Sequence, residues 1–305
     1  MKKLLLLFIY IGLSSGMVKA QQDAQYTDYM YNTISFNPGY TGTREALSIL
    51  GLYRNQWAGL NGAPETVGLS AHAPVGKKVG LGINISNDKI FVVNEIAVDF
   101  FFSYQLDLSE KAKLSLGLKG GINQYSVDFT KANTGGYDPG DYNLNNSGST
   151  LSPQTGFGAF YYTDNFYAGI SIPNLLNTSH FSDVNKGLKN DRLHLYYIIG
   201  KVFNFGPDIK FKPSGLVKMV SGSPLQVDVS SNVMFADKFT LGLAYRWDAA
   251  LSCQTGFQIS DKYMIGYAYD WETTKLAQYN HGSHEIFLRY ELFSKRGKIL
   301  SPRFF

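Results

Sequence analysis

Apolar and polar residues alternate along most of the chain after residue 45. Between 225 and 235, Leu, Val and Phe occupy every odd position except Ser231, whereas Gln, Asp, Ser and Asn fill the even positions from 226 to 232. The same alternation recurs at 239–247 and 263–271. Successive side chains of a β-strand point to opposite faces, so this period of two predicts strands with one apolar and one polar face.

Applied along the chain, the alternation predicts fourteen strands. Many reach ten residues or more, whereas strands of globular proteins most often have about five or six. Strands that cross a membrane need about 9–11 residues, and bacterial membrane barrels have an even number of them. We therefore expect an all-β fold, a transmembrane antiparallel β-barrel over residues 46–293. The predicted strands are 46–57, 66–73, 77–87, 92–107, 112–128, 154–163, 165–172, 192–205, 210–220, 224–236, 238–248, 250–260, 262–271 and 283–293.

The connections between the predicted strands differ at the two ends of the barrel. Links after even-numbered strands are tight, whereas the long links, notably 129–153, 173–191 and 272–282, follow odd-numbered strands. Two odd-side links, at 221–223 and at Ala249, are short and weaken this rule without reversing it. Short turns at one rim and long loops at the other are typical of outer-membrane barrels. An even strand count then places both termini at the periplasmic, short-turn rim.

A secreted soluble β-sandwich is the alternative architecture, because its strands alternate in the same way. Strand length, the asymmetry of the rims and a leader sequence together favour the barrel. In lipid every backbone N–H and C=O must be paired within the protein, so a membrane sheet closes on itself. The apolar parity then faces hydrocarbon, and Tyr245, Trp247, Tyr269 and Trp271 suit an aromatic girdle at the membrane interface.

Residues 1–20 have the pattern of a signal peptide. Lys2 and Lys3 precede an apolar run over 4–13, and small or tolerated residues precede a predicted cut after Ala20. The run is about half of the ~20 residues that a membrane-spanning helix needs, which argues against an uncleaved anchor. Cleavage also removes Lys19, so the mature chain has 25 basic and 24 acidic residues instead of 28 and 24. Such a balance gives no nucleic-acid footprint. The signal peptide and the predicted barrel together indicate export to the outer membrane.

Several charged residues share the polar, inward parity. They could line a polar channel or a catalytic site, but a paired network that fills the lumen is the favoured interpretation, because buried charges persist when paired. One Cys excludes a disulfide framework, and no HExxH, GxGxxG or P-loop string is present. We expect no enzyme activity, cofactor or metal. The inward charges are Glu95, Asp99, Asp228, Arg246, Asp270, Glu285 and Arg289.

An ordered set of short motifs covers nearly the whole mature chain. It resembles the PorP/SprF family of outer-membrane proteins, which are associated with type IX secretion and gliding motility in Bacteroidetes. Each string alone is weak, whereas their order is specific. The strings are QYTDYMYNTISFNPGYTGTR (25–44), YRNQW (53–57), GAPETVGLSAHAP (62–74), PSGLVK (213–218), PLQVDV (224–229), GLAYRWDA (242–249), IGYAYD (265–270), GSHEIFL (282–288) and the final SPRFF (301–305).

The resemblance implies a fourteen-stranded barrel related in architecture to FadL-type transporters. It also implies a non-enzymatic role in which the barrel anchors or assists export of a secreted surface protein, often an adhesin, or contacts periplasmic secretion components. The motifs do not decide between these partners, and they mark no catalytic residue. A FadL-like or porin-like transporter of small or hydrophobic solutes remains the second functional class.

Two terminal segments flank the predicted barrel. Residues 21–45 could fold inside as a plug or lie on the periplasmic rim as a docking surface, and Arg54, Gln56, Glu285 and Arg289 are predicted to point inward and hold either the seam or this segment. The basic tail 294–305 is either a contact for secretion partners or an assembly signal. The family-motif, lumen and seam candidates are Arg54, Asn55, Gln56, Trp57, His72, Asp228, Arg246, Asp270, His284, Glu285 and Arg289.

Overall fold

The structure, a computed structural model, describes residues 27–128, 148–176, 193–221 and 223–293. The predicted signal peptide, the basic tail and most of the two longest predicted loops therefore lie outside the described residues. No helix in the described part of the chain is long and apolar enough to cross a membrane.

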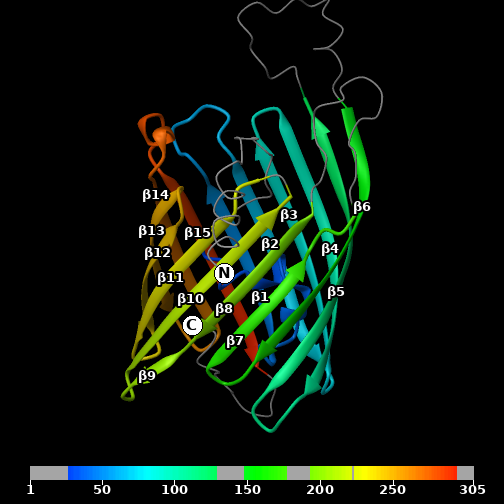
Figure 1. Cartoon of the computed structure of the whole chain (residues 1–305), viewed down its shortest axis with the longest axis vertical. Coiled ribbons are helices and arrows are strands. Elements are labelled where there is room, and N and C mark those ends of the chain that lie inside the picture. The colour runs from blue at the N-terminus through cyan, green and yellow to red at the C-terminus, as the bar shows by residue number, and fades with distance from the viewer. Residues whose placement is uncertain (1–26, 129–147, 177–192, 222, 294–305) are drawn as a thin grey trace, which may run out of the picture.

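The chain forms a closed antiparallel β-barrel (Figure 1). Strands that follow one another in sequence are paired except β8 and β9, β15 pairs with β1, and β10 pairs with both β8 and β11. β8 and β9 both pair with β10 and are separated only by Val202, so they are two parts of one wall strand. The described residues thus form the fourteen predicted wall strands. The elements are β1 (Ala46–Asn55), β2 (Glu65–Val75), β3 (Val79–Ile90), β4 (Val93–Asp107), β5 (Lys113–Val127), β6 (Gly148–Tyr162), β7 (Phe166–Ile172), β8 (His194–Lys201), β9 (Phe203–Phe205), β10 (Ile209–Val220), β11 (Gln226–Phe235), β12 (Phe239–Arg246), β13 (Ala250–Gln258), β14 (Tyr263–Glu272) and β15 (Ser283–Phe293).

The two faces of the wall differ as the alternation predicts. Leu69, Leu118 and Leu243 on the outer face are 52%, 61% and 62% exposed, whereas Ser115 and Asn232 on the inner face are fully buried. An apolar outer surface of this extent is unusual for a soluble protein and matches the lipid-facing band of a membrane barrel. The barrel prediction is confirmed over the sandwich.

Several strand boundaries differ from the prediction, and the start of β6 differs most. β6 begins at Gly148, six positions before the predicted start at 154, although it contains Pro153. The carbonyl of Thr155 accepts a hydrogen bond from the backbone N–H of Leu175, on the side of β6 away from β5. Residues two apart in a strand direct their backbone groups to the same side, so the nitrogen of Pro153 also points away from β5. The pairing of β7 with β6 reaches only to Phe157, so the missing N–H breaks no ladder there.

The end of the first strand was also predicted too late. β1 ends at Asn55 rather than at 57, because Trp57 adopts a left-handed conformation with φ of 55° and Gln56 donates its backbone N–H to Pro64 instead of to a neighbouring strand. At the same rim, β3 extends to Ile90, which leaves a two-residue link to β4 and adds a third short connection.

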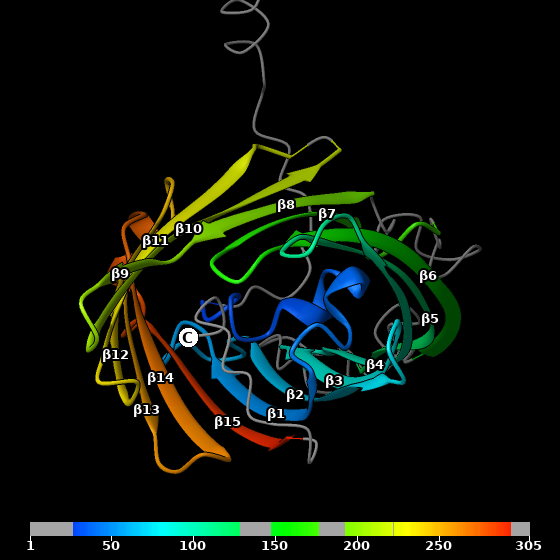
Figure 2. The same cartoon turned by 90° about the horizontal axis from the view of Figure 1, so that it is seen from below.

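The interior holds an aromatic core to which the segment before β1 contributes. Figure 2 shows this segment, with the short 3-10 helices η1 (Thr33–Ser35) and η2 (Pro38–Tyr40), inside the ring of strands. Phe101, which breaks the alternation of its strand, is buried in the same core. The core comprises Tyr29, Met30, Tyr31, Ile34, Phe36 and Tyr40 from the segment, together with Leu50, Leu52, Phe101, Phe160, Tyr162, Tyr167, Tyr196, Ile198, Leu216, Met264 and Phe287 from the wall.

Candidate functional site

Residues 27–44, here called the luminal segment, run through the barrel from one rim toward the other. Thr27 contacts Arg54, the penultimate residue of β1 at the rim that carries the β1–β2 and β14–β15 loops. Gly42 lies against Gly80 and Pro74, at the rim with the short β2–β3 turn. The segment therefore spans most of the length of the wall, and the antiparallel register of the strands decides which side chains meet it.

A buried cluster of three charges receives the start of the luminal segment. Arg54 in β1 lies directly opposite Glu285 in β15, and Asp270 belongs to the next strand, β14. The guanidinium of Arg54 lies 2.9 Å from Glu285 Oε2 and 2.8 Å from Asp270 Oδ2. The side chains of all three residues are almost fully buried. We call this cluster the ionic clamp.

The ionic clamp binds backbone and side-chain groups of the luminal segment. Glu285 accepts hydrogen bonds from the backbone N–H groups of Thr27 and Asp28, at 2.9 and 3.0 Å. The hydroxyl of Thr27 accepts a bond from Arg54 at 2.7 Å and donates to Asp270. Such charge-assisted bonds are about twice as strong as neutral ones. The clamp therefore fixes the position of Thr27 relative to three neighbouring strands.

A second ion pair extends the ionic clamp along the wall. Arg246 in β12 pairs with Asp228 in β11 at 2.7 Å and lies 3.8 Å from Asp270. Asp270 is thus flanked by two guanidinium groups, and Glu285 by one. Buried charges are tolerated when they are paired and hydrogen-bonded in this way, which agrees with the predicted paired network.

The other end of the luminal segment is tied by separate contacts. Arg44 pairs with Glu291 in β15, and Arg289 lies 3.9 Å from the same carboxylate. His72 in β2 accepts a hydrogen bond at Nδ1 from the backbone N–H of Gly42, at 3.1 Å. Its ring also packs edge-on against Tyr40, with centroids 5.4 Å apart. Both ends of the segment are therefore held by buried polar contacts.

Glycines in the wall let the middle of the luminal segment approach the strand backbone. A Cβ atom at Gly117 would overlap the backbone of Pro38, and one at Gly158 would overlap the amide of Asn37. Asn37 itself donates to the carbonyl of Ala159 at 3.2 Å. Larger residues at these strand positions would displace η2, so the glycines determine how close the segment lies to β5 and β6.

Asp28 is a buried acidic residue of the luminal segment whose carboxyl group forms no bond with the ionic clamp. It is 1% exposed, and neither of its carboxylate oxygens accepts a hydrogen bond from the described residues. Burial raises the pKa of Asp28 well above its usual value, and the nearby carboxylates of Glu285 and Asp270 raise this pKa further, against the opposing effect of Arg54 and Lys212. The folded barrel therefore favours a protonated Asp28.

Replacing Asp28 with asparagine is expected to stabilise the barrel more at pH 8 than at pH 4. The folded-state pKa of Asp28 is raised, so the folded state binds this proton more tightly than the unfolded chain, and stability falls as the pH rises from the unfolded value of 3.8 to the folded one. Asparagine removes this loss. Thermal unfolding in detergent across pH 4–8 measures it, and a gain in melting temperature that is equal at both ends of the range would contradict the assignment.

The predicted site residues separate into an inner and an outer group. Asn55 and His284 form a cross-strand pair. They lie on the outer face because they are the strand neighbours of Arg54 and Glu285, which point inward, and successive side chains of a strand alternate between faces. His284 Nδ1 lies 2.7 Å from the hydroxyl of Tyr267. Gln56 and Trp57 lie in the β1–β2 loop, where the Trp57 indole donates to Glu272 at 3.1 Å. The inner group is Arg54, His72, Asp228, Arg246, Asp270, Glu285 and Arg289.

Sequence reasoning missed three contact residues. Glu291 shares the inward parity of Glu285 and Arg289, so the alternation itself contained the signal. Thr27 and Arg44 precede the first strand, where no alternation indicates direction. Within the described ranges, no group of three His, Cys, Asp or Glu side chains is arranged to hold a metal ion.

Solved barrels resemble this one in fold at low sequence identity. The Acinetobacter baumannii outer membrane protein Omp33 is 7% identical with a TM-score of 0.48, covering 82% of this chain and 100% of its own. The CymD monoaromatic hydrocarbon channel is 12% identical with a TM-score of 0.48, covering 93% and 97%. The Ralstonia pickettii toluene transporter TbuX is 10% identical with a TM-score of 0.48, covering 91% and 95%. At these scores the likenesses carry no inference about what this chain binds.

The family of the chain is shown by its sequence. No curated protein sequence matches it significantly. The profile of the family described as type IX secretion system membrane protein PorP/SprF matches residues 18–290, in agreement with the ordered motifs. Because this match spans most of the chain, the protein belongs to the PorP/SprF family of type IX secretion system membrane proteins.

Proposed function

We propose that this protein is a non-enzymatic outer-membrane barrel that anchors or assists export of a partner surface protein, such as an adhesin, and contacts periplasmic secretion components. The observation that carries the proposal is the luminal segment, which is buried inside the barrel and held by hydrogen bonds to the ionic clamp at one end and by the ion pair of Arg44 with Glu291 at the other. A barrel whose interior is occupied by its own chain is suited to binding partners at its rims rather than to passing solutes.

The width of the barrel supports a plugging role for the luminal segment. Side chains alone fill a barrel of about eight strands, so fourteen strands leave an interior that needs further filling. Tyr29, Tyr31, Ile34 and Tyr40 supply large buried groups there, at 2–7% exposure. Withdrawing the segment from the core would expose apolar surface and would also remove the hydrogen bonds that the ionic clamp makes with Thr27 and Asp28. No contact among the described residues favours the solute-transporter alternative.

The loop rim offers an ordered surface to an extracellular partner. The β1–β2 and β14–β15 loops are hydrogen-bonded to each other, with Ala58 donating to Gly282 at 2.7 Å and His281 donating to Ala58 at 2.8 Å. The exposed Tyr279 lies in the second of these loops. A surface that is fixed before binding loses less conformational entropy when a partner docks, which favours stable anchoring.

Affinity capture from detergent-solubilised membranes tests the proposed function. The tagged barrel is expected to retain a secreted surface protein and at least one periplasmic secretion component, both identified by mass spectrometry. Cells lacking the barrel should lose surface retention of that secreted protein. Retention that is unchanged in such cells, together with solute-dependent swelling of liposomes that contain the wild-type barrel, would instead support transport.

A further inference from the structure

A row of polar side chains crosses the outer face of the barrel at the loop rim. His284, Asn55, Glu65, Lys89 and Asn94 follow one another across β15, β1, β2, β3 and β4, each opposite the next in the strand pairing. Their strand neighbours Arg54 and Thr66 are buried on the inner face, so the row itself faces outward. We call it the outer polar row.

The surface below the outer polar row is predominantly apolar. The next outward positions along the same strands include Ile286, Tyr53 and Val67, which are 43%, 41% and 51% exposed, and the positions after them include Leu69 and Ile85. Lipid tails solvate such a surface, and polar side chains begin where the headgroups lie. The outer polar row therefore marks the level of the lipid headgroups at this rim.

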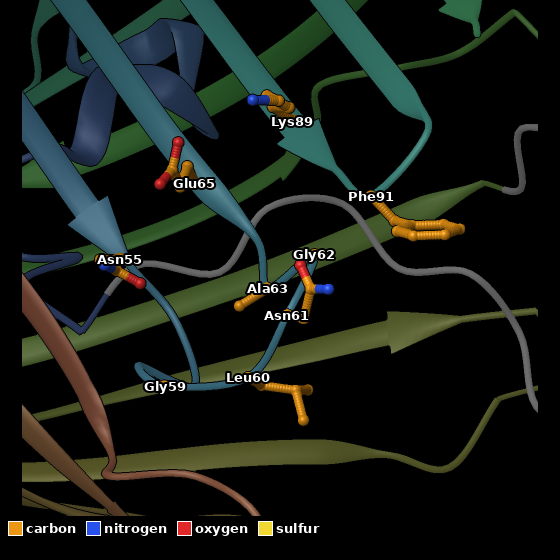
Figure 3. A pocket seen from close by; sticks show the side chains of 9 residues that line it. All are labelled: Asn55, Gly59, Leu60, Asn61, Gly62, Ala63, Glu65, Lys89 and Phe91. Carbon is orange, nitrogen blue, oxygen red and sulfur yellow. The ribbon is translucent and has the colours of Figure 1, made fainter. Parts of the chain in front are cut away.

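A pocket of about 430 Å³ lies at this level between the β1–β2 loop and the β3–β4 turn (Figure 3). Asn55, Glu65 and Lys89 of the outer polar row line it, together with Phe91 and loop residues 59–63. It therefore combines charged and amide groups with an exposed aromatic ring, next to the apolar band of the wall.

The walls of this pocket are fixed by close backbone contacts. Phe91 donates its backbone N–H to the carbonyl of Gly62 at 3.1 Å. Its ring packs so closely against Gly62 that a Cβ atom there would lie only 2.6 Å from a ring carbon. Both residues have left-handed backbone conformations, with φ of 54° and 76°. A non-glycine residue in this region is uncommon and marks a locally determined geometry. On the other side, Gly59 is packed against the ring of His281. The pocket is thus formed before any ligand binds.

Two opposite charges face the pocket without neutralising each other. Glu65 and Lys89 are directly opposed on β2 and β3, which places their Cβ atoms about 4.5–5.5 Å apart. Among the described residues, however, neither charged group forms an ion pair. A ligand that carries a cation and an anion a short distance apart could satisfy both side chains, whereas a simple anion would be repelled by Glu65 and a simple cation by Lys89.

We propose that this pocket binds the phosphoethanolamine group of a membrane lipid. In this arrangement Glu65 accepts hydrogen bonds from the ligand ammonium, Lys89 donates to its phosphate, and the amide of Asn61 donates to a phosphate oxygen. Because the outer polar row lies at the level of the lipid headgroups, the ligand is expected to be the headgroup of a lipid whose acyl chains cover the adjacent apolar band. This assignment requires the barrel to lie in a membrane but does not depend on which protein it anchors.

Native mass spectrometry of the detergent-purified full barrel tests the assignment. The probes are phosphatidylethanolamine, phosphatidylglycerol, which lacks an ammonium, and phosphatidylcholine, whose quaternary ammonium cannot donate a hydrogen bond. The wild type is expected to prefer phosphatidylethanolamine about three- to fivefold. Because all three probes carry a phosphate, Lys89→Gln should weaken the binding of each of them, whereas Glu65→Gln should lose the preference for phosphatidylethanolamine. The control pair Glu110→Gln and Lys111→Gln, exposed in the β4–β5 turn at the opposite rim, should keep it.

Lipid A with and without a phosphoethanolamine substituent distinguishes a glycolipid source from a phospholipid source. Asn61→Ala, in an exposed loop, provides a second variant if the strand substitutions impair folding, and it should weaken binding as well. Equal binding of the three phospholipids by the wild type, an unchanged preference in a folded Glu65→Gln variant, or undiminished binding by a folded Lys89→Gln variant would overturn the assignment.

Discussion

Replacing Arg54 with alanine is expected to lower the free energy of unfolding by about 3–5 kcal/mol. The guanidinium of Arg54 neutralises Glu285 and Asp270 and also donates to Thr27, all in nearly complete burial. Its loss leaves Glu285 without its ion-pair partner and Asp270 with only the more distant Arg246. Breaking a buried pair from one side costs more than the pair itself contributes, because the remaining charge stays buried.

Unfolding in denaturant, with the barrel in detergent, measures this loss. Lys77→Ala is the matched control, because it removes a cation from the exposed β2–β3 turn and should change stability by less than about 0.5 kcal/mol. Arg54→Lys should recover only part of the loss, since an ammonium cannot bind two carboxylates with the geometry of a guanidinium. If Arg54→Ala and Lys77→Ala had the same stability, the ionic clamp would not hold the structure together as described.

The second large effect is expected from Gly117→Ala, which should loosen the luminal segment. The added methyl group would overlap the backbone of Pro38, so either η2 or β5 must move, at a cost of about 1–3 kcal/mol. Displacing η2 also disturbs Asn37, which caps this 3-10 helix and bonds to β6. The expected results are a lower melting temperature and faster proteolytic cleavage within residues 27–44.

Gly120→Ala is the control for this experiment, since it lies in the same strand and its new methyl group would meet nothing within 4 Å. Intrinsic strand propensity changes equally in both variants, so any difference between them reports on the contact with the luminal segment. Equal melting temperatures and equal cleavage rates for Gly117→Ala and Gly120→Ala would show that the segment does not rest against β5.

The strands of the barrel wall can be predicted from the local pattern of apolar and polar residues, whereas some of the positions at which strands begin and end cannot. The period of two gives every wall strand because each outward side chain meets lipid and each inward one meets polar groups. The prediction started β6 too late because a proline usually ends a strand. Pro153 is tolerated inside β6 because β7 does not extend far enough to pair with it, and this cannot be seen in the local sequence. The left-handed Trp57 that ends β1 has no local sequence signal.

The ionic clamp was predictable in part. Barrel closure makes the first and last strands neighbours, and shared parity then places Arg54 and Glu285 on the same inner face. The odd offset between Glu285 and His284 likewise requires the histidine to face outward. The contacts of Thr27 with Asp270 and Glu285 are separated by more than 240 residues in sequence, so no local pattern contains them. The path of residues 27–44 depends on packing across the whole interior.

Ion conductance across planar bilayers tests the central claim most directly, namely that the luminal segment blocks the interior of the barrel. The wild-type barrel should show no steady open channel, whereas a chain lacking residues 27–43 should conduct as a wide, continuously open pore. A wild-type conductance as large as that of the shortened chain would contradict the account.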